Sequence, residues 1–103
     1  MVFIESAVVT RQVKELLSEK SYAEFHQRLG AHPQLGGVIQ GNGGLRKVRW
    51  SIKGGGKNGG VRVIYFHVVA QAQVRLLLIY RKGVKDDLTA AEKKVLRKLN
   101  ADW

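Results

Sequence analysis

Basic side chains are concentrated between Gly44 and Tyr65, where the sequence reads GLRKVRWSIKGGGKNGGVRVIY. This stretch contains no acidic residue, and its cations are Arg46, Lys47, Arg49, Lys53, Lys57 and Arg62. A guanidinium group can bind two phosphate oxygens at once, whereas a lysine is a point charge that can also serve as a base once it is deprotonated. These residue types in one stretch favour binding of a phosphate group and chemistry on it.

The segment at about residues 45–51 has the pattern of a β-strand, in which alternate side chains share a face. One face of this strand carries Arg46, Val48 and Trp50. Val48 and Trp50 suit a core, so we expect Lys47 and Arg49, on the other face, to line an open surface of the sheet.

Two further cations can converge on this surface from neighbouring strands. Arg62 begins the strand expected at residues 61–69, and it can lie near Arg49 if the two strands pair. Lys82 ends the strand expected at residues 73–81 and can approach from the next position in the sheet. A solvated edge strand with protective lysines is the alternative, but it does not explain an arginine within the otherwise apolar segment GGVRVIY.

The charge of the whole chain is strongly positive and unevenly distributed. The 103 residues carry a formal net charge of +10. Between residues 25 and 85 there are eleven Lys or Arg residues and no Asp or Glu, whereas both signs are mixed towards the two ends. A protein that is merely soluble usually intersperses its charges. The distribution therefore favours a polyanionic partner: nucleic acid, an acidic protein or an anionic membrane.

The glycine-rich segment GGGKNGG at residues 54–60 contains the pattern GxGxxG. The dinucleotide-binding form of this pattern must follow a strand and open a helix, but here a strand is expected next. We interpret the segment as a hairpin loop that presents Lys57 to phosphate, with a plain flexible hairpin as the alternative.

Other kinds of site have little support in the sequence. His26, His32 and His67 are scattered without metal-ligand spacing, so neither a metal site nor another cofactor is expected. Asp86 and Asp87 are adjacent in an expected turn, and we expect them to bind basic neighbours rather than to act as paired acids. There is no cysteine, which suits a reducing cytoplasm. No apolar run approaches the roughly 18 residues needed to cross a bilayer.

Three helices are expected. Thr10 can cap the first, whose apolar positions are Val13, Leu16 and Leu17. Residues 21–24 have the form of a capping box for the second helix, which ends near Gly30 and Pro33. Residues 89–92 form another capping box and open the last helix, with the inward positions Val95, Leu96 and Leu99.

The order of elements is a strand at residues 2–4, two helices, three strands and a final helix. Neighbouring strands joined by loops favour an antiparallel sheet with the helices on one side. The run LLLI at residues 76–79 is apolar on both faces, which predicts a central strand. We therefore expect one domain over residues 1–103 with an α+β fold: a small twisted antiparallel sheet with two N-terminal helices and one C-terminal helix.

The segments GLRKVRW, GGVRVIY and LLIYRKGVKDDLT occur in this order, with a basic glycine loop between the first two. Together they resemble the HigB branch of the RelE/HigB toxin superfamily, and the match runs from VFIES to DDLTAAEKK. The resemblance implies a RelE-like fold and the toxin of a bacterial type II toxin–antitoxin module. It also implies a cytoplasmic mRNA interferase that cuts mRNA in the ribosomal A site and is neutralised by a helix-turn-helix antitoxin.

The resemblance also assigns residues. Lys47 and Arg49 match the basic pair on the family's second strand, and Arg62 matches the arginine that opens the third. Lys82 matches the basic residue that ends the fourth strand. Many RelE-type members have a tyrosine near the start of the last helix, where this sequence reads Asp87-Leu88-Thr89.

The implied reaction needs no metal, because RNA carries its own nucleophile, the 2′-hydroxyl group. Lys47 would be the general base and Lys82 the acid, with the division between the two lysines left open. Arg49 and Arg62 would hold the scissile phosphate in its transition state. The residues expected to position RNA are Arg46, Lys53, Lys57 and Arg81.

Two other interpretations stay open from the residues alone. One is a non-catalytic RNA- or DNA-binding module, because phosphate contacts need no proton transfer. The other is an interaction protein whose basic face binds only an acidic partner.

Overall fold

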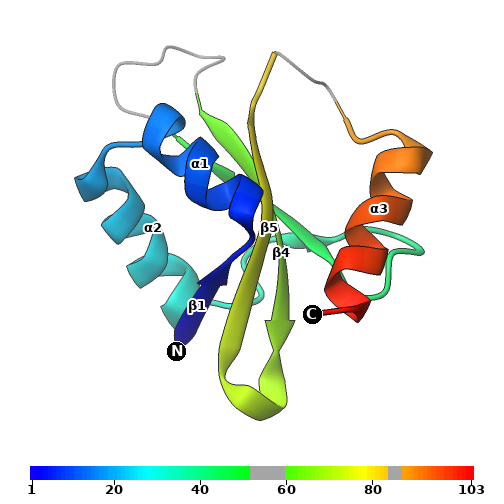
Figure 1. Ribbon diagram of the computed structural model, residues 1–103. Coiled ribbons are helices and arrows are strands. Elements are labelled where there is room, and N and C mark those ends of the chain that lie inside the picture. Colours follow the sequence, from blue (N-terminus) through cyan, green and yellow to red (C-terminus); the bar gives the residue numbers. More distant parts are fainter. Residues whose placement is uncertain (52–59, 84–86) are drawn as a thin grey trace.

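A five-stranded sheet forms the middle of the molecule. The computed structural model describes residues 1–51, 60–83 and 87–103, and its strands pair in the order β1-β5-β4-β3-β2 (Figure 1). The strands are β1 (Val2–Glu5), β2 (Gly37–Val38), β3 (Arg46–Trp50), β4 (Val61–Val68) and β5 (Gln73–Arg81). The helices are α1 (Ala7–Leu16), α2 (Glu19–Ala31), α3 (Ala90–Ala101) and a short 3-10 helix, Val69–Gln71. The predicted α+β class and the order of the long helices are confirmed, while the two-residue strand β2 was not expected.

β1 makes the sheet mixed instead of wholly antiparallel. The strands β2 to β5 pair antiparallel in sequence order, and this confirms the prediction for β3, β4 and β5. β1 pairs parallel to β5, with Val2 opposite Gln73 and Glu5 opposite Leu76. No hairpin fixes the direction of β1, because α1 and α2 follow it and carry the chain to the other edge of the sheet. The apolar strand β5 is therefore interior, as its sequence indicates, but β4 is the middle strand.

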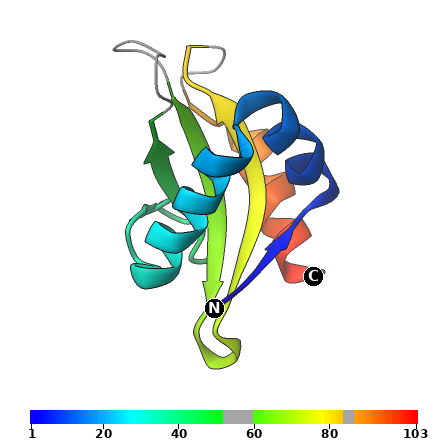
Figure 2. The same cartoon turned by 90° about the vertical axis from the view of Figure 1, so that its left-hand side faces the viewer.

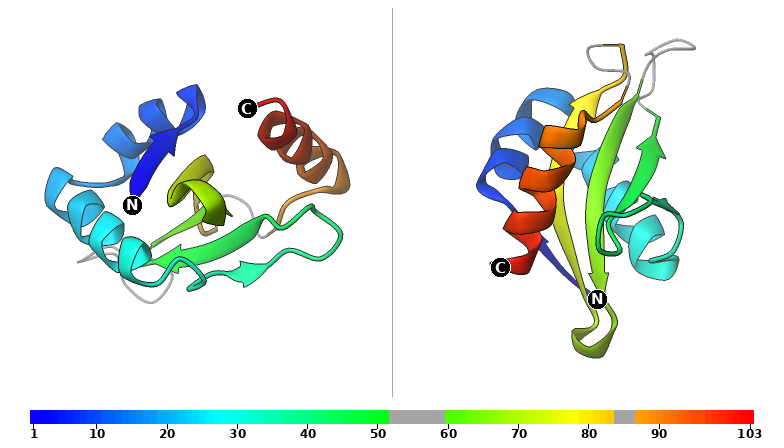
Figure 3. Two further views of the ribbon diagram at one scale, coloured as in Figure 1. Left: turned by 90° about the horizontal axis from the view of Figure 1, so that it is seen from below. Right: turned by 90° about the vertical axis from the view of Figure 1, so that its right-hand side faces the viewer.

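Helices cover both faces of the sheet, so the expectation of helices on one side is wrong. One core cluster joins α1 and α2 to the sheet through Val9, Phe25, Leu29, Val63 and Tyr65. A second cluster lies on the opposite face, here called the α3 face, and contains Leu45, Ile64, Leu77, Leu88 and Leu96. Figure 2 shows α2 in front of the sheet, and the right-hand panel of Figure 3 shows α3 in front of it from the other side. Successive residues of β4 are apolar, and both of its faces need cover from water.

The first two helices begin earlier than expected. Ser6 caps α1, because its Oγ accepts a hydrogen bond from the Val9 N–H at 3.2 Å. Thr10 lies inside α1, and its hydroxyl donates to Glu5. Ser18 caps α2 by accepting from the N–H of Ser21 at 3.0 Å. In both places a serine a few residues upstream supplies the cap, so the predicted caps become interior positions.

The last helix begins as predicted but presents a different face. Thr89 and Glu92 form the capping box, since each side chain accepts a hydrogen bond from the other residue's N–H. Leu96 is buried against the sheet, whereas Val95 is 66% exposed and Leu99 is 40% exposed. The prediction that all three point inward is wrong, because α3 contacts the sheet along a narrow stripe. No helix within the described ranges combines the length and apolar character needed to cross a membrane.

Candidate functional site

Three polar side chains form a row across the α3 face of the sheet. Arg49 on β3 lies directly opposite Arg62 on β4, and Arg62 lies directly opposite Tyr80 on β5. Residues that oppose each other across antiparallel strands share a face and approach closely. In the next row, Lys47 lies opposite Ile64, a core residue of the α3 face. The predicted convergence of Lys47, Arg49 and Arg62 is therefore present.

The two arginines are placed against each other at a cost. Like charges directly opposite in a sheet destabilise it, yet Arg49 and Arg62 hold this position in the register. Arg49 is exposed, while Arg62 is half-buried and its guanidinium donates to the carbonyl oxygen of Val61 at 3.4 Å. A sheet position where two arginines oppose each other suits an anion with several oxygens, such as a phosphate.

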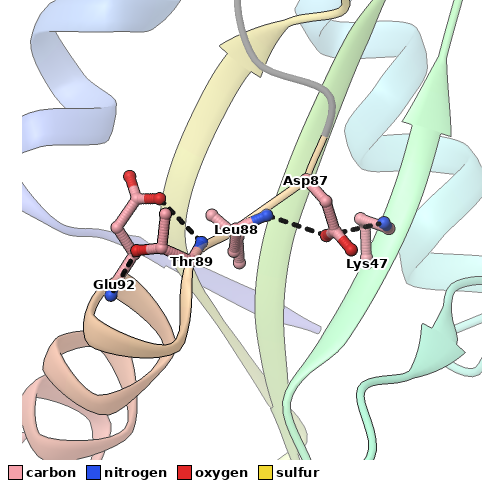
Figure 4. Close-up of polar contacts among 5 residues, drawn as sticks. All are labelled: Lys47, Asp87, Leu88, Thr89 and Glu92. Carbon is pink, nitrogen blue, oxygen red and sulfur yellow. Dashed lines mark hydrogen bonds and ion pairs between the residues drawn. The ribbon is translucent and has the colours of Figure 1, made fainter.

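Asp87 brings a carboxylate to the edge of this cationic group. Its Oδ1 lies 3.6 Å from Nζ of Lys47 and accepts a hydrogen bond from the N–H of Leu88 at 2.8 Å (Figure 4). That hydrogen bond lowers the pKa of Asp87 most, and the charge of Lys47 lowers it further. Asp87 thus binds a basic residue as predicted, but that residue is Lys47 and not one of its neighbours in the sequence. Asp86 lies outside the described residues.

The capping box of α3 explains why Asp87 is held there. Asp87 precedes Leu88, which is buried in the α3-face core, and Leu88 precedes the cap residue Thr89. The chain is thus fixed directly after the point where Asp87 turns towards Lys47 (Figure 4). The start of α3 therefore places the carboxylate of Asp87 beside Lys47.

Tyr80 is a member of the row that sequence reasoning did not single out. It is 7% exposed and packs in the α3-face core. Its hydroxyl oxygen is buried and has no hydrogen-bond partner among the described residues. Burial is the main cause that raises the pKa of Tyr80; the charge of Asp87 raises it further and that of Arg62 lowers it. Within the apolar run LLLIY, only the register opposite Arg62 could have revealed this residue.

The remaining catalytic candidate lies at the end of β5. Lys82 is exposed and follows the last residue of the strand, and its backbone N–H donates to the carbonyl oxygen of Gly60 at 3.3 Å. It is two residues beyond Tyr80, so the alternation of β5 continued by one step places it on the α3 face. This position is compatible with the predicted convergence and does not by itself test it.

Two of the four residues expected to position RNA are described, and they lie on different strands. Arg46 points with Val48 to the opposite face, where its guanidinium donates to the carbonyl oxygen of Gly36 at 2.7 Å. Arg81 is exposed at the end of β5, opposite Val61. Lys53 and Lys57 lie outside the described residues. The RNA-binding roles of all four stay predictions.

A groove runs beside β3 next to the cationic group. Its volume is about 350 Å³, and its lining residues are Arg28, Leu35, Lys47, Val48, Arg49 and Trp50. Arg28 comes from α2 and adds a cation that sequence reasoning did not foresee. Among the described residues, no group of three His, Cys, Asp or Glu side chains is placed to hold a metal ion. The groove therefore offers mainly basic and apolar side chains to a ligand.

Comparison with known proteins supports the fold. No family model matches the chain. A double mutant of the E. coli toxin RelE in the free state superposes with a TM-score of 0.59 at 10% sequence identity, covering 82% of this chain and 86% of that one. The isolated E. coli RelE toxin also gives a TM-score of 0.59, at 9% identity, covering 95% of this chain and 97% of that one. At these identities the likeness concerns architecture, and the chain accordingly has a RelE-like fold.

Proposed function

We propose that this protein is the toxin of a bacterial type II toxin–antitoxin module, of the HigB branch, and that it cuts mRNA in the ribosomal A site. The observation that carries the proposal is the direct opposition of Arg49 and Arg62 beside Lys47 on one face of a RelE-like sheet. The sheet tolerates the repulsion between the two guanidinium groups. A bound phosphate would turn that repulsion into attraction.

The proposed reaction is attack of the RNA 2′-hydroxyl oxygen on the adjacent phosphorus atom. The bond from O2′ to phosphorus forms and the bond to the leaving 5′-oxygen breaks, which leaves a cyclic 2′,3′-phosphate and a 5′-hydroxyl group. Lys47 takes the proton from the 2′-hydroxyl, and Lys82 gives a proton to the 5′-oxygen. Arg49 and Arg62 bind the charge that develops on the phosphate oxygens.

The ion pair with Asp87 adds a condition to this scheme. Nζ of Lys47 lies 3.6 Å from the Asp87 carboxylate, so the lysine has an acidic neighbour as well as the basic ones. It can act on RNA only after this contact has been broken. A phosphate that binds at Arg49 and Arg62 competes with Asp87 for Lys47.

The same ion pair favours a second candidate, a non-catalytic RNA-binding module. A lysine held by a carboxylate can bind phosphate as a charge without transferring a proton. The two candidates differ in whether RNA is cut when the protein acts on translating ribosomes.

The expected partners follow from the proposed family. The ribosome would orient mRNA against a weak acid–base set, which accelerates reaction by fixing geometry. A small helix-turn-helix antitoxin encoded beside this protein would neutralise it, and both would act in the cytoplasm.

Induced expression of the unpartnered protein tests the proposal. We expect growth arrest and new mRNA ends within coding regions, detected by primer extension on a translated reporter. Arg62→Ala, expressed to the same level, is the matched control and should leave the transcript intact. Intact transcripts with growth arrest would favour the binding module, and intact transcripts with normal growth would contradict both candidates.

A further inference from the structure

The hydroxyl group of Tyr80 lies where a phenylalanine would pack equally well. Tyr80 belongs to an apolar cluster with Leu88 and Leu96, and its oxygen is buried without a hydrogen-bond partner among the described residues. Buried tyrosine hydroxyls usually find a partner. Tyr65, on the other face of the sheet, does so: it donates to Pro33 and accepts from the N–H of Gly36. Within the described part of the chain, the Tyr80 hydroxyl is thus a donor without an acceptor.

The position of Tyr80 relates this donor to the charged groups of the site. Tyr80 lies directly opposite Arg62 in the sheet, and Arg62 lies opposite Arg49. Leu88, the residue after Asp87, packs in the same core cluster as Tyr80, and the charge of Asp87 raises the pKa of Tyr80, although no hydrogen bond joins the two side chains. The donor therefore belongs to the strand position next to Arg62 and to the core cluster that holds Leu88, the residue after Asp87.

Asp87 poses a problem for phosphate binding that this donor could solve. The carboxylate contacts Lys47 at 3.6 Å and would repel an incoming phosphate. When a phosphate takes Lys47, Asp87 keeps its hydrogen bond from Leu88 but loses its cation. A second donor directed away from the phosphate would stabilise the displaced carboxylate.

We infer that Tyr80 is a positioning residue whose hydroxyl receives the carboxylate of Asp87 when an RNA phosphate takes Lys47. This inference rests on the proposed function, because it assumes that RNA binds at Lys47, Arg49 and Arg62. The displaced carboxylate exchanges an ion pair for a hydrogen bond, and the unused donor gains an acceptor. Tyr80 acts through Asp87 and does not itself contact the RNA.

A double-mutant cycle on the full chain tests the inference. The probe is a short RNA whose 2′-hydroxyl groups are all methylated, so that it cannot be cut, and the measurement is its Kd at fixed salt. Tyr80→Phe should weaken binding roughly tenfold when Asp87 is present, because it removes a hydrogen bond to a charged group. Asp87→Ala should tighten binding by removing the competing carboxylate. In the Asp87→Ala background, Tyr80→Phe should change the Kd by less than about twofold, since no carboxylate remains to be received.

Each contrary result overturns the inference. If Tyr80→Phe changes the Kd equally with and without Asp87, the hydroxyl acts through packing. If Tyr80→Phe leaves the Kd unchanged when Asp87 is present, the hydroxyl does not bind the Asp87 carboxylate. Tyr65→Phe is the control for loss of a buried hydroxyl elsewhere and should leave the Kd unchanged. Arg62→Ala distinguishes failure of the inference from failure of the proposed function. If Arg62→Ala leaves the Kd unchanged, RNA does not bind at this site, and the proposed function fails along with the inference.

Discussion

Arg49 and Arg62 lie directly opposite each other on adjacent antiparallel strands, on the face of the sheet that α3 partly covers. Sheets usually place opposite charges or apolar pairs in this relationship, because like charges there are destabilising. The pair concentrates positive charge at a position that the backbone fixes. A phosphate would reverse the sign of this interaction, so the protein should be more stable with a bound polyanion than without one.

Neutralising one member of this pair should stabilise the free protein. Arg49→Gln is expected to raise the free energy of unfolding by about 0.2–1 kcal/mol, because it removes the cross-strand repulsion. Denaturation in urea at low salt measures the change, and the same variant should lose RNA cleavage. Arg11→Gln, at an exposed position of α1 away from the site, controls for the loss of one net charge. Equal stabilisation of both variants would show that net charge and not the pairing is responsible.

Substitutions of Lys47 show whether this residue transfers a proton or only supplies a positive charge. Lys47→Ala and Lys47→Arg should both reduce cleavage, by about 100- to 10,000-fold if Lys47 is the general base. Arginine keeps the charge and can still pair with Asp87, but it cannot accept a proton at ordinary pH. Single-turnover cleavage on programmed ribosomes is the measurement. A Lys47→Arg variant that cuts at the full rate would assign Lys47 an electrostatic role.

Arg62 should affect the chemical step more than the affinity for the ribosome. β4 holds it rigidly, and a guanidinium fixed in this way can bind two phosphate oxygens. Arg62→Ala and Arg62→Lys should lower single-turnover cleavage at saturating ribosomes by roughly 100- to 1,000-fold. Lys57→Ala should instead shift the ribosome concentration needed for half-maximal rate. Normal cleavage by Arg62→Ala at saturation would make Arg62 a docking contact.

The two buried tyrosines of the sheet should respond in opposite ways to loss of their hydroxyl groups. Tyr65→Phe removes a donor to Pro33 and leaves the N–H of Gly36 without its acceptor, so it should destabilise the fold by about 1–3 kcal/mol. Tyr80→Phe removes a hydroxyl without a hydrogen-bond partner in the described part of the chain, so it should leave stability unchanged or raise it. Urea denaturation of the two variants in parallel compares them. A destabilised Tyr80→Phe protein would mean that the hydroxyl is already bound in the free state.

His26 should make stability depend on pH. It stacks on Phe3, with ring centres 4.2 Å apart, and lies near Tyr22 and Glu5. Burial lowers the pKa of His26 below its ordinary value of 6.5, and the charge of Glu5 only partly opposes this. The unfolded chain therefore binds a proton more readily than the folded one, and stability should fall as pH decreases below about 6.5. Unfolding free energies between about pH 7 and pH 5 measure the slope, and His26→Phe should reduce it.

The strands and their cations were predictable because alternation is a local property. The side chains of Arg46, Val48 and Trp50 separate from those of Lys47 and Arg49 as the period of two requires. The antiparallel pairing of β3 with the next strand, β4, then places Arg62 opposite Arg49. A short stretch of sequence thus determined most of the site's cationic part.

What the sequence did not reveal depends on contacts between distant elements. The direction of β1 is set by its pairing with β5, and the face of α3 that is buried is set by the second core cluster. Asp87 reaches Lys47 only because the start of α3 is fixed beside β3. Tyr80 looks like one more apolar residue until its register with Arg62 is known. Each of these depends on tertiary packing, which a local pattern does not encode.

The parallel pairing of β1 with β5 also determines when the protein can fold during its own synthesis. Residues 2–5 are made before their partners in the sheet, residues 73–76, because each partner lies much later in the sequence. Contacts so far apart in sequence form late, because the intervening chain must first be ordered. The row from Arg49 to Tyr80 likewise spans three strands and is incomplete until the third has emerged. A chain still being translated therefore lacks the assembled cationic surface until β5 has emerged from the ribosome.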